Sequence, residues 1–209
     1  MTKEIAVNTT EFFSVVERVY AFHGRRAPGI VIGVAMVHKA VELLGNVKKQ
    51  IAFVETRTCL PDVVQYLCGC TIGNGDLRMV DQMGKYAFSL FNKDTGNGIR
   101  VFIDINKISL ENTPELYKFF LRRRDPVVLT SKEARKASGE LVVKEFLTVA
   151  DKIIGSEKVS ALDLSKPELF EANICLNCKE SFTTPSKDNN ICPHCSQEFS
   201  YYKICEQQS

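Results

Sequence analysis

The chain has 209 residues, of which 44% are hydrophobic and 25% charged, and its formal net charge is +2; these values are ordinary for one or two globular domains and predict no large polyanion as a partner. The N-terminal residues lack the basic and then apolar order of a signal peptide, and the longest apolar run, around 29–37, is too short to span a bilayer. We therefore expect a cytoplasmic protein whose eight cysteines are metal ligands or reactive thiols rather than disulfides.

The N-terminal quarter of the chain predicts two helices and a strand. Asn8 and Glu11 have the spacing of a capping box and open a helix that is expected to end near 23–24. Pro28 is a favourable first residue for a second helix, whose apolar residues recur at helical spacing until a glycine ends it. The apolar run 51–54 is expected to form a buried strand.

The middle of the chain predicts a short helix and then strands. Pro61 opens the helix, which should run through Leu67. Strands are expected at 77–80, 86–92 and 99–105, and a run of turn-forming residues joins the last two as a hairpin.

Further along, Thr113 and Pro114 are typical first residues of a helix, which should run through Arg123. Thr130 opens another helix with capping-box spacing, which should end at Gly155 before a strand over 159–164. Because helices and neighbouring strands are segregated along the chain, we expect an α+β core with a mostly antiparallel sheet.

Two CxxC pairs, thirteen residues apart, form the most specific motif of the sequence: Cys175, Cys178, Cys192 and Cys195. Each pair can direct two sulfurs at one ion, and the segment between them can form a hairpin, so the spacing predicts a four-thiolate Zn²⁺ site. Two disulfides or four free thiols are the alternatives. We expect a core domain over 1–165 and a zinc finger domain over 166–209.

One segment of the core places a histidine and two arginines immediately before a helix. His23 and Arg25 precede the helix that begins at Pro28, where backbone N–H groups and the helix dipole favour an anion. His23 is a candidate ligand or general base, although a histidine at a helix end is more often a cap or a packing residue.

A second segment places two cysteines around the short helix. Cys59 lies just before the helix, a position expected to lower its thiol pKa, so it is a candidate nucleophile or ligand. Cys70 follows the same helix in a glycine-rich loop. Either thiol could instead be a small buried hydrophobe. Because the helix separates them by about 15 Å, at ~1.5 Å per residue, they meet only if the loop folds back or a second protomer supplies one of them.

An ordered series of motifs connects these segments. It reads F-H-G-x-x-x-P-G-x-x-x-G from Phe22, V-E-T-x-x-C-x-x-D-x-x-Q-x-x-x-G-C-T-x-G-x-G-x-L from Val54, and D-x-x-G-K-x-A-F from Asp81. The pattern resembles the FmdE family of formylmethanofuran dehydrogenase components, and the likeness covers roughly residues 10–155. The family takes its name from a molybdenum or tungsten enzyme that fixes carbon dioxide onto methanofuran, but many members occur apart from that enzyme.

The resemblance implies an α+β core, intertwined homodimers, and a cleft that bears His and Cys. It also implies a C-terminal treble-clef zinc finger, which some members carry. On this basis His23, Cys59 and Cys70 are the candidate catalytic residues, and Arg25 and Lys85 are the candidate substrate-binding residues.

The chain also departs from the family pattern. Many members read H-G-H-x-C-P-G, but here the second His is Arg25 and the Cys is Ala27. In the glycine-rich turn, the common G-K-G-N-L reads Gly73-Asn74-Gly75-Asp76-Leu77 here, so a cation is also lost. The core therefore lacks two potential metal ligands, and a second metal there is less expected than in a typical member.

These observations favour a zinc-binding accessory protein or enzyme of one-carbon or redox metabolism that uses the His/Cys cleft. The alternative is a structural or partner-docking zinc-finger protein without catalysis. Nucleic-acid binding is disfavoured, because residues 160–209 hold four Lys or Arg against seven Asp or Glu, whereas phosphate binding needs the opposite sign.

Overall fold

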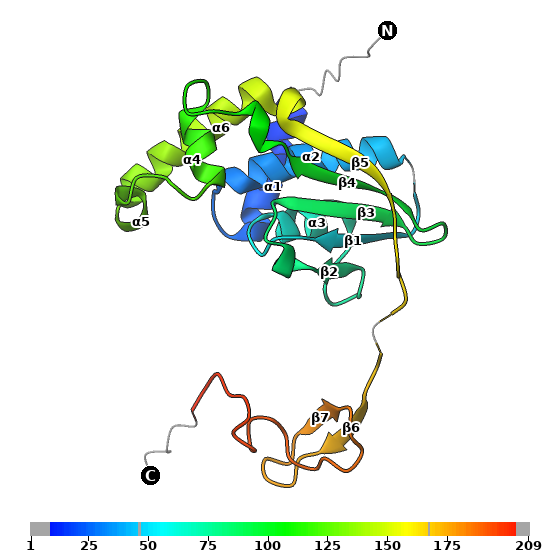
Figure 1. The fold of residues 1–209 in the computed structure, drawn as a ribbon. Helices are drawn as coiled ribbons and strands as arrows, with labels where there is room; N and C mark the ends of the chain where they lie inside the picture. The colour runs from blue at the N-terminus through cyan, green and yellow to red at the C-terminus, as the bar shows by residue number, and fades with distance from the viewer. Residues whose placement is uncertain (1–8, 46, 167, 204–209) are drawn as a thin grey trace. The chain divides into compact units, whose positions relative to one another are not determined.

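The computed structural model describes residues 9–45, 47–166 and 168–203. The chain divides into two compact units between Leu164 and Ser165 (Figure 1). The first unit contains the long helices and a five-stranded sheet, and the second contains a two-stranded hairpin.

The helices of the first unit are α1 (Thr9–His23), α2 (Pro28–Leu44), α3 (Leu60–Cys68), α4 (Pro114–Phe120), α5 (Val127–Thr130) and α6 (Lys132–Ile153). Its strands are β1 (Gln50–Val54), β2 (Leu77–Met79), β3 (Ala87–Asn92), β4 (Asn97–Ile103) and β5 (Ile154–Ser160). Among the residues that the structure describes, no helix is long and apolar enough to cross a membrane.

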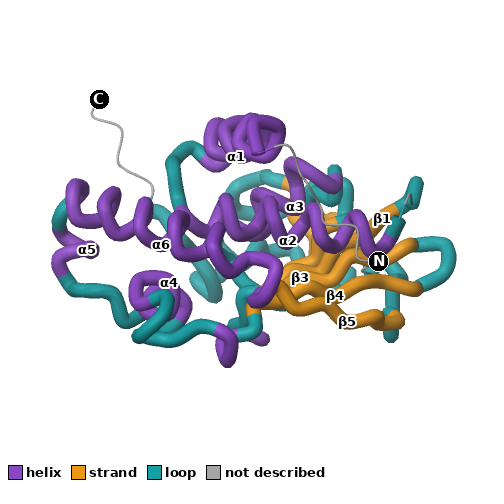
Figure 2. Tube along the Cα trace, turned by 90° about the horizontal axis from the view of Figure 1, so that it is seen from above, coloured by secondary structure: helices purple, strands orange, loops and turns teal. Residues whose placement is uncertain are grey.

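The sheet has the strand order β2-β1-β3-β4-β5. Only β1 and β2 are parallel, and the other neighbouring strands are antiparallel. The helices gather on one side of the strands (Figure 2). The expected α+β core with a mostly antiparallel sheet is therefore confirmed.

Helix α2 is the centre of the core. It packs against β3, β4, α1, α3 and α6. Its side chains are buried around most of its circumference, including Ile30, Ile32 and Val34, which are fully buried. A helix that is apolar on nearly every side is stable only when it is enclosed in this way.

The expected elements up to the β3–β4 hairpin lie within two residues of the observed ones. Helix α4 begins at Pro114 with Thr113 as its N-cap, as expected, but ends at Phe120 rather than at Arg123. The start of α6 differs, because Ser131 rather than Thr130 is its N-cap, and the Ser131 hydroxyl accepts a hydrogen bond from the Ala134 N–H at 3.1 Å. The last strand also differs, since Gly155 does not end the helix but lies inside β5. All seven residues of β5 pair with β4, and this ladder draws the strand to an earlier position than 159–164. Asn8 lies outside the described residues.

The second unit is small and built around a hairpin. Strands β6 (Glu171–Ile174) and β7 (Ser181–Thr184) are antiparallel, and the first CxxC pair occupies the turn between them. The second pair lies in the loop that follows β7. This arrangement is the local basis of the cysteine cluster described below.

Candidate functional site

His23, Asp62 and Cys59 form a chain of contacts in the first unit. His23 is the last residue of α1, Cys59 is the N-cap of α3, and Asp62 lies in the first turn of α3. The Nδ1 atom of His23 is 2.6 Å from an Asp62 carboxylate oxygen, and its Nε2 atom is 3.9 Å from the Cys59 sulfur. The His23 side chain is only 8% exposed. The imidazole therefore lies between a carboxylate and a thiol, with one ring nitrogen facing each.

Local backbone geometry brings these groups together. Gly24 has a φ of +79°, which ends α1 and turns the chain toward α2. Cys59 has a φ of +53°, a conformation that costs a non-glycine residue free energy. The Cys59 carbonyl accepts hydrogen bonds from the N–H groups of Asp62 and Val63, which begin the helix. A strained backbone at a polar site is a common mark of function.

Gly29, in the first turn of α2, is in close contact with this site. A Cβ atom at position 29 would lie 2.9 Å from the Cys59 sulfur and 2.9 Å from the Tyr86 hydroxyl oxygen. The Tyr86 hydroxyl donates a hydrogen bond to the Gly29 carbonyl oxygen at 2.7 Å. Only a glycine leaves room here for both the thiol and the phenol.

Burial determines the protonation of the Cys59 thiol. Desolvation raises its pKa to about 11, while Arg25 acts to lower the pKa and Asp62 to raise it. The expectation that the helix N-terminus lowers this pKa is therefore wrong, because the cost of burying a thiolate outweighs the favourable charges. Cys59 rests as a neutral thiol at physiological pH.

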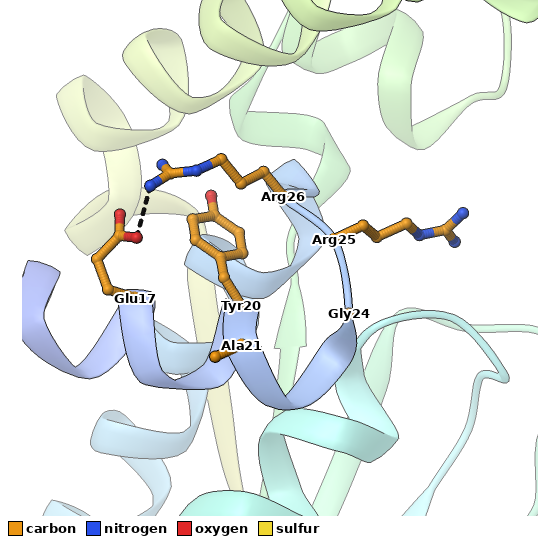
Figure 3. Close-up of a pocket in the computed structure, with 6 residues that line it drawn as sticks. All are labelled: Glu17, Tyr20, Ala21, Gly24, Arg25 and Arg26. Atoms are coloured by element: carbon orange, nitrogen blue, oxygen red, sulfur yellow. Dashed lines mark hydrogen bonds and ion pairs between the residues drawn. The ribbon is translucent and has the colours of Figure 1, made fainter.

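Arg25 and Arg26 border a cavity of about 340 Å³ at the turn between α1 and α2 (Figure 3). A guanidinium nitrogen of Arg26 lies 2.5 Å from a carboxylate oxygen of Glu17, and the guanidinium lies over the Tyr20 ring. In Figure 3 Arg25 points away from this group. Within the described residues Arg25 makes no ion pair, so its charge is available to a ligand.

Lys85 and Cys70, the other two candidate residues of the core, both lie apart from the His23–Cys59 pair. Lys85 is exposed and adjoins Tyr86 in the chain. Cys70 lies beyond the opposite end of α3 and borders a second cavity, of about 290 Å³, together with Cys68 and Lys93. Its sulfur lies 3.8 Å from the Cys68 carbonyl oxygen, and burial raises its pKa to about 11. The structure thus brings Cys59 next to His23 but does not bring Cys70 there.

Sequence reasoning did not assign Asp62 and Tyr86 to the site. Asp62 follows Cys59 by three residues, so both lie in the same helical turn, and this spacing was a usable signal. Tyr86 had no such signal, because its contact with Gly29 joins residues 57 positions apart.

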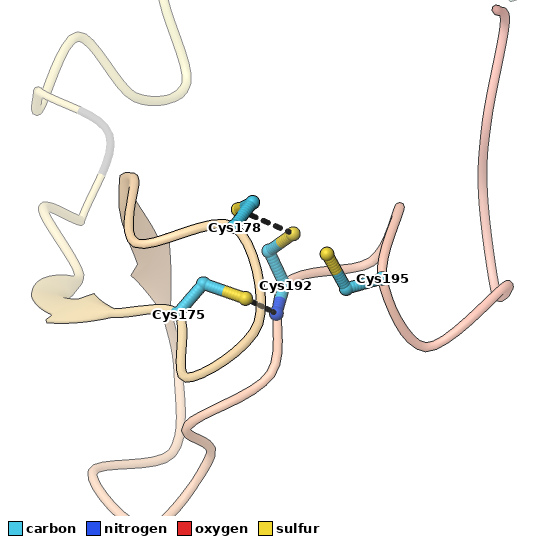
Figure 4. A group of neighbouring side chains, drawn as sticks. All are labelled: Cys175, Cys178, Cys192 and Cys195. Atoms are coloured by element: carbon cyan, nitrogen blue, oxygen red, sulfur yellow. Dashed lines mark hydrogen bonds between the residues drawn. The ribbon is translucent and has the colours of Figure 1, made fainter. Parts of the chain in front are cut away.

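The four cysteines of the second unit form a compact cluster (Figure 4). Their sulfur atoms all lie within 4.8 Å of one another. The sulfurs of Cys178 and Cys192 are 3.9 Å apart, close to the separation of about 3.8 Å that follows from Zn–S bonds of ~2.3 Å in a tetrahedron. No disulfide bond joins any of these four cysteines in the described part of the chain. The cluster can hold one metal ion.

Hydrogen bonds and neighbouring groups shift the pKa values of Cys175 and Cys195 in opposite directions. The Cys192 backbone N–H donates to the Cys175 sulfur at 3.4 Å and is the main cause that lowers the pKa of Cys175 to about 6. Desolvation and the neighbouring thiols raise the pKa of Cys195 to about 12. Like charges so close together oppose the ionisation of all four sulfurs unless a cation accompanies it.

His194 is turned toward the chain that follows the second CxxC pair. Its Nδ1 atom is 2.7 Å from the Ser200 hydroxyl, and its ring stacks on Tyr202 with centroids 4.3 Å apart. His194 is not a member of the group of potential ligands found among the described residues. Cys205 lies outside the described residues.

Comparisons with known proteins agree on one family. Residues 22–156 match the family model described as FmdE, molybdenum formylmethanofuran dehydrogenase operon. A crystal structure of a tungsten formylmethanofuran dehydrogenase FmdE-like protein from Syntrophus aciditrophicus is similar, with a TM-score of 0.73 and 34% identity over 91% of this chain and 95% of that chain.

A curated relative from Archaeoglobus fulgidus is described as a probable S-adenosyl-L-methionine-binding protein. It is 28% identical over 200 residues, which is 90% of this chain. The chain spans about half the length of this relative, 53%.

We expect Gly29→Ala to destabilise the first unit, because the new methyl group would collide with the Cys59 side chain and the Tyr86 hydroxyl. The expected loss is about 1–3 kcal/mol, typical of overpacking a close contact, and urea unfolding measures it. The matched control is Gly139→Ala in α6, where the nearest atom to a new Cβ is a Pro28 carbon at 3.4 Å. That control should be neutral or gain up to ~1 kcal/mol from helix propensity. Equal stability of the two variants would contradict the close packing at Gly29.

Proposed function

The chain belongs to the FmdE family, and from this premise we propose that it is a zinc-stabilised protein of one-carbon or redox metabolism whose working site is the His23–Cys59 cleft. The observation that carries the proposal is the alignment of carboxylate, imidazole and thiol, at 2.6 Å and 3.9 Å. A histidine with a carboxylate on one nitrogen and a thiol on the other is arranged for proton transfer. Whether it serves as an enzyme or as an accessory protein depends on what enters the cleft.

The names of the relatives support a one-carbon substrate. One name refers to an enzyme of formyl chemistry, and the other to S-adenosyl-L-methionine, a donor of methyl groups. Both names contain a compound that carries a one-carbon group, a formyl group in one and a methyl group in the other. We propose that Arg25 and Lys85 bind an anionic part of such a substrate, since both are exposed cations, Arg25 two residues after His23 and Lys85 next to Tyr86 in the chain.

Zinc is the ion we propose for the second unit. Zn²⁺ prefers four thiolates in a tetrahedron, and Cys175, Cys178, Cys192 and Cys195 supply four sulfurs at compatible separations. With four protein ligands the ion has no open position, so its role is to stabilise a treble-clef-type finger over 166–209. The assignment of Cys70 to the catalytic site stays a prediction, and the proposed function uses Cys59 and not Cys70.

A homodimer in the cytoplasm is the assembly we propose. The family resemblance implies dimers, and exposed apolar side chains on α5 and α6 are consistent with a covered face: Leu129, Leu141 and Leu147 are 75%, 48% and 44% exposed. The free thiols fit a reducing compartment.

A structural or partner-docking protein is the second candidate function. It is favoured by the apolar side chains that the second unit exposes, among them Phe199 at 67% and Tyr201 at 85%. So many exposed rings on a small unit are typical of an interaction surface. The two functions are separable, because docking needs the second unit and the cleft does not.

Chelation should unfold the second unit and leave the first unit folded, because the hairpin has little core of its own and depends on the ion. We expect amide signals of 168–203 in a ¹H–¹⁵N spectrum to collapse to unfolded positions after treatment with a strong zinc chelator. The spectrum of the first unit should be retained. Cys178→Ser should produce the same change without chelator, and Cys68→Ser is the matched control. A dispersed second-unit spectrum in protein shown to be metal-free would contradict a zinc staple.

The cleft should bind a one-carbon donor. Titration calorimetry with S-adenosyl-L-methionine and with N-formylglycine is expected to give a Kd between about 1 μM and 1 mM for at least one of them. His23→Ala should weaken that binding at least about tenfold, or ~1.4 kcal/mol, while Lys152→Ala on the exposed face of α6 should not change it. If neither compound binds the folded protein, the one-carbon proposal is wrong.

A further inference from the structure

The pairing of His23 with Asp62 fixes where the imidazole holds its proton. A carboxylate only accepts hydrogen bonds, so Nδ1 donates to Asp62 and carries the ring proton. The Nε2 atom then has a free lone pair. That lone pair faces the Cys59 sulfur at 3.9 Å, so the arrangement is a carboxylate, an imidazole and a thiol in sequence.

The same geometry argues against a metal ion held by these three residues. Nδ1 and Nε2 of His23 point at different partners, so an ion on Nε2 could not also bind Asp62 through the same site. Such an ion would have only His23 and Cys59 as protein ligands, whereas catalytic zinc sites use three. Among the described residues, the only group of three or more potential ligands is the cysteine cluster of the second unit.

We infer that Cys59, His23 and Asp62 form a nucleophilic triad for the transfer or hydrolysis of small activated acyl groups, of which a formyl group is the smallest. This inference deepens the proposed function and rests on it only for the identity of the natural acyl group. Cys59 and His23 are the catalytic residues, and Asp62 is a positioning residue that acts through His23. Carboxylate–imidazole–nucleophile sets of this geometry occur on unrelated folds.

The chemistry balances without a cofactor. Nε2 of His23 removes the thiol proton while Sγ bonds to the carbonyl carbon of the substrate, and the bond from that carbon to the leaving nitrogen, oxygen or sulfur breaks. The proton on Nε2 passes to the leaving group. A water molecule, or a second acceptor, then attacks the thioester in the same manner and restores the thiol, so that hydrolysis yields one carboxylic acid and one protonated leaving group.

The groups around Cys59 determine the expected pH dependence. Asp62, Arg25, Tyr86 and Tyr20 interact electrostatically with the thiol, and the Nε2 atom of His23 lies 3.9 Å from its sulfur, in position to accept its proton. Because burial raises the pKa of Cys59 to about 11, the free thiolate is scarce at neutral pH. Reaction near pH 7 therefore needs a base beside the thiol, and the Nε2 atom of His23 is in contact with the Cys59 sulfur.

The test uses the full, metal-loaded chain and p-nitrophenyl acetate as a small acyl donor. Intact mass spectrometry and peptide mapping should find one acetyl group on Cys59, with a matching burst of p-nitrophenolate. Cys59→Ala should abolish both, and Cys68→Ala, at the other end of α3, should retain both. An unmodified Cys59 in folded protein would overturn the inference.

The Asp62→Asn variant tests whether Asp62 positions the imidazole of His23 or only stabilises the fold. It should slow acylation at pH 7 by about a hundredfold, because the amide no longer holds the productive tautomer. Its rate should then keep rising toward pH 11, as expected of a thiol without a base, whereas the wild-type rate should depend less steeply on pH because the imidazole accepts the thiol proton. His23→Gln should give the same steep profile. A wild-type profile in both variants would overturn the triad.

The outcomes also separate this inference from the proposed one-carbon function. Acetylation of Cys59 with no binding of S-adenosyl-L-methionine or N-formylglycine would support the triad and refute the one-carbon role. Binding of either compound without acylation of Cys59 would support the one-carbon role and overturn the triad.

Discussion

The hydrogen bond between His23 and Asp62 joins the end of α1 to the first turn of α3, and the candidate site depends on it. It holds the imidazole in one orientation and one tautomer, so that the opposite nitrogen faces Cys59. The two helices can meet here because α2 passes close beside them, and Gly29 leaves space for the thiol and for Tyr86. The core packing and the chemistry of the site thus rest on the same few contacts.

Much of the fold could be predicted from local pattern. Capping residues, helix-starting prolines and apolar periodicity place α1, α2, α3 and the hairpin strands. The errors fall where tertiary pairing overrides local signals: Gly155 looked like a helix stop but belongs to a strand because β4 supplies its hydrogen-bond partners. The cysteine cluster was predictable from spacing alone, since a CxxC pair constrains its own geometry.

The sequence alone indicated which residues could belong to the candidate site, but not which of them are in contact. His23 and Cys59 stood out as residue types, but their contact joins positions 36 apart in the chain, which no local pattern encodes. The sign of the Cys59 pKa shift was wrong for a related reason, because burial is a property of the assembled core. Cys70 resembled Cys59 in sequence context, yet it lies at the other end of α3 among different neighbours. Residue type suggests chemistry, but tertiary packing decides which groups meet.

The proposals assign two kinds of cysteine chemistry to the two units: a closed metal site at the cysteine cluster of the second unit, and a thiol site without metal in the core. Metal content per chain tests this division most directly, measured by elemental mass spectrometry on protein purified without added metal. The account predicts one zinc ion per chain, unchanged by His23→Ala. Two metal ions per chain, with one lost from the His23→Ala variant, would contradict it, because Cys59 would then be a metal ligand rather than a nucleophile.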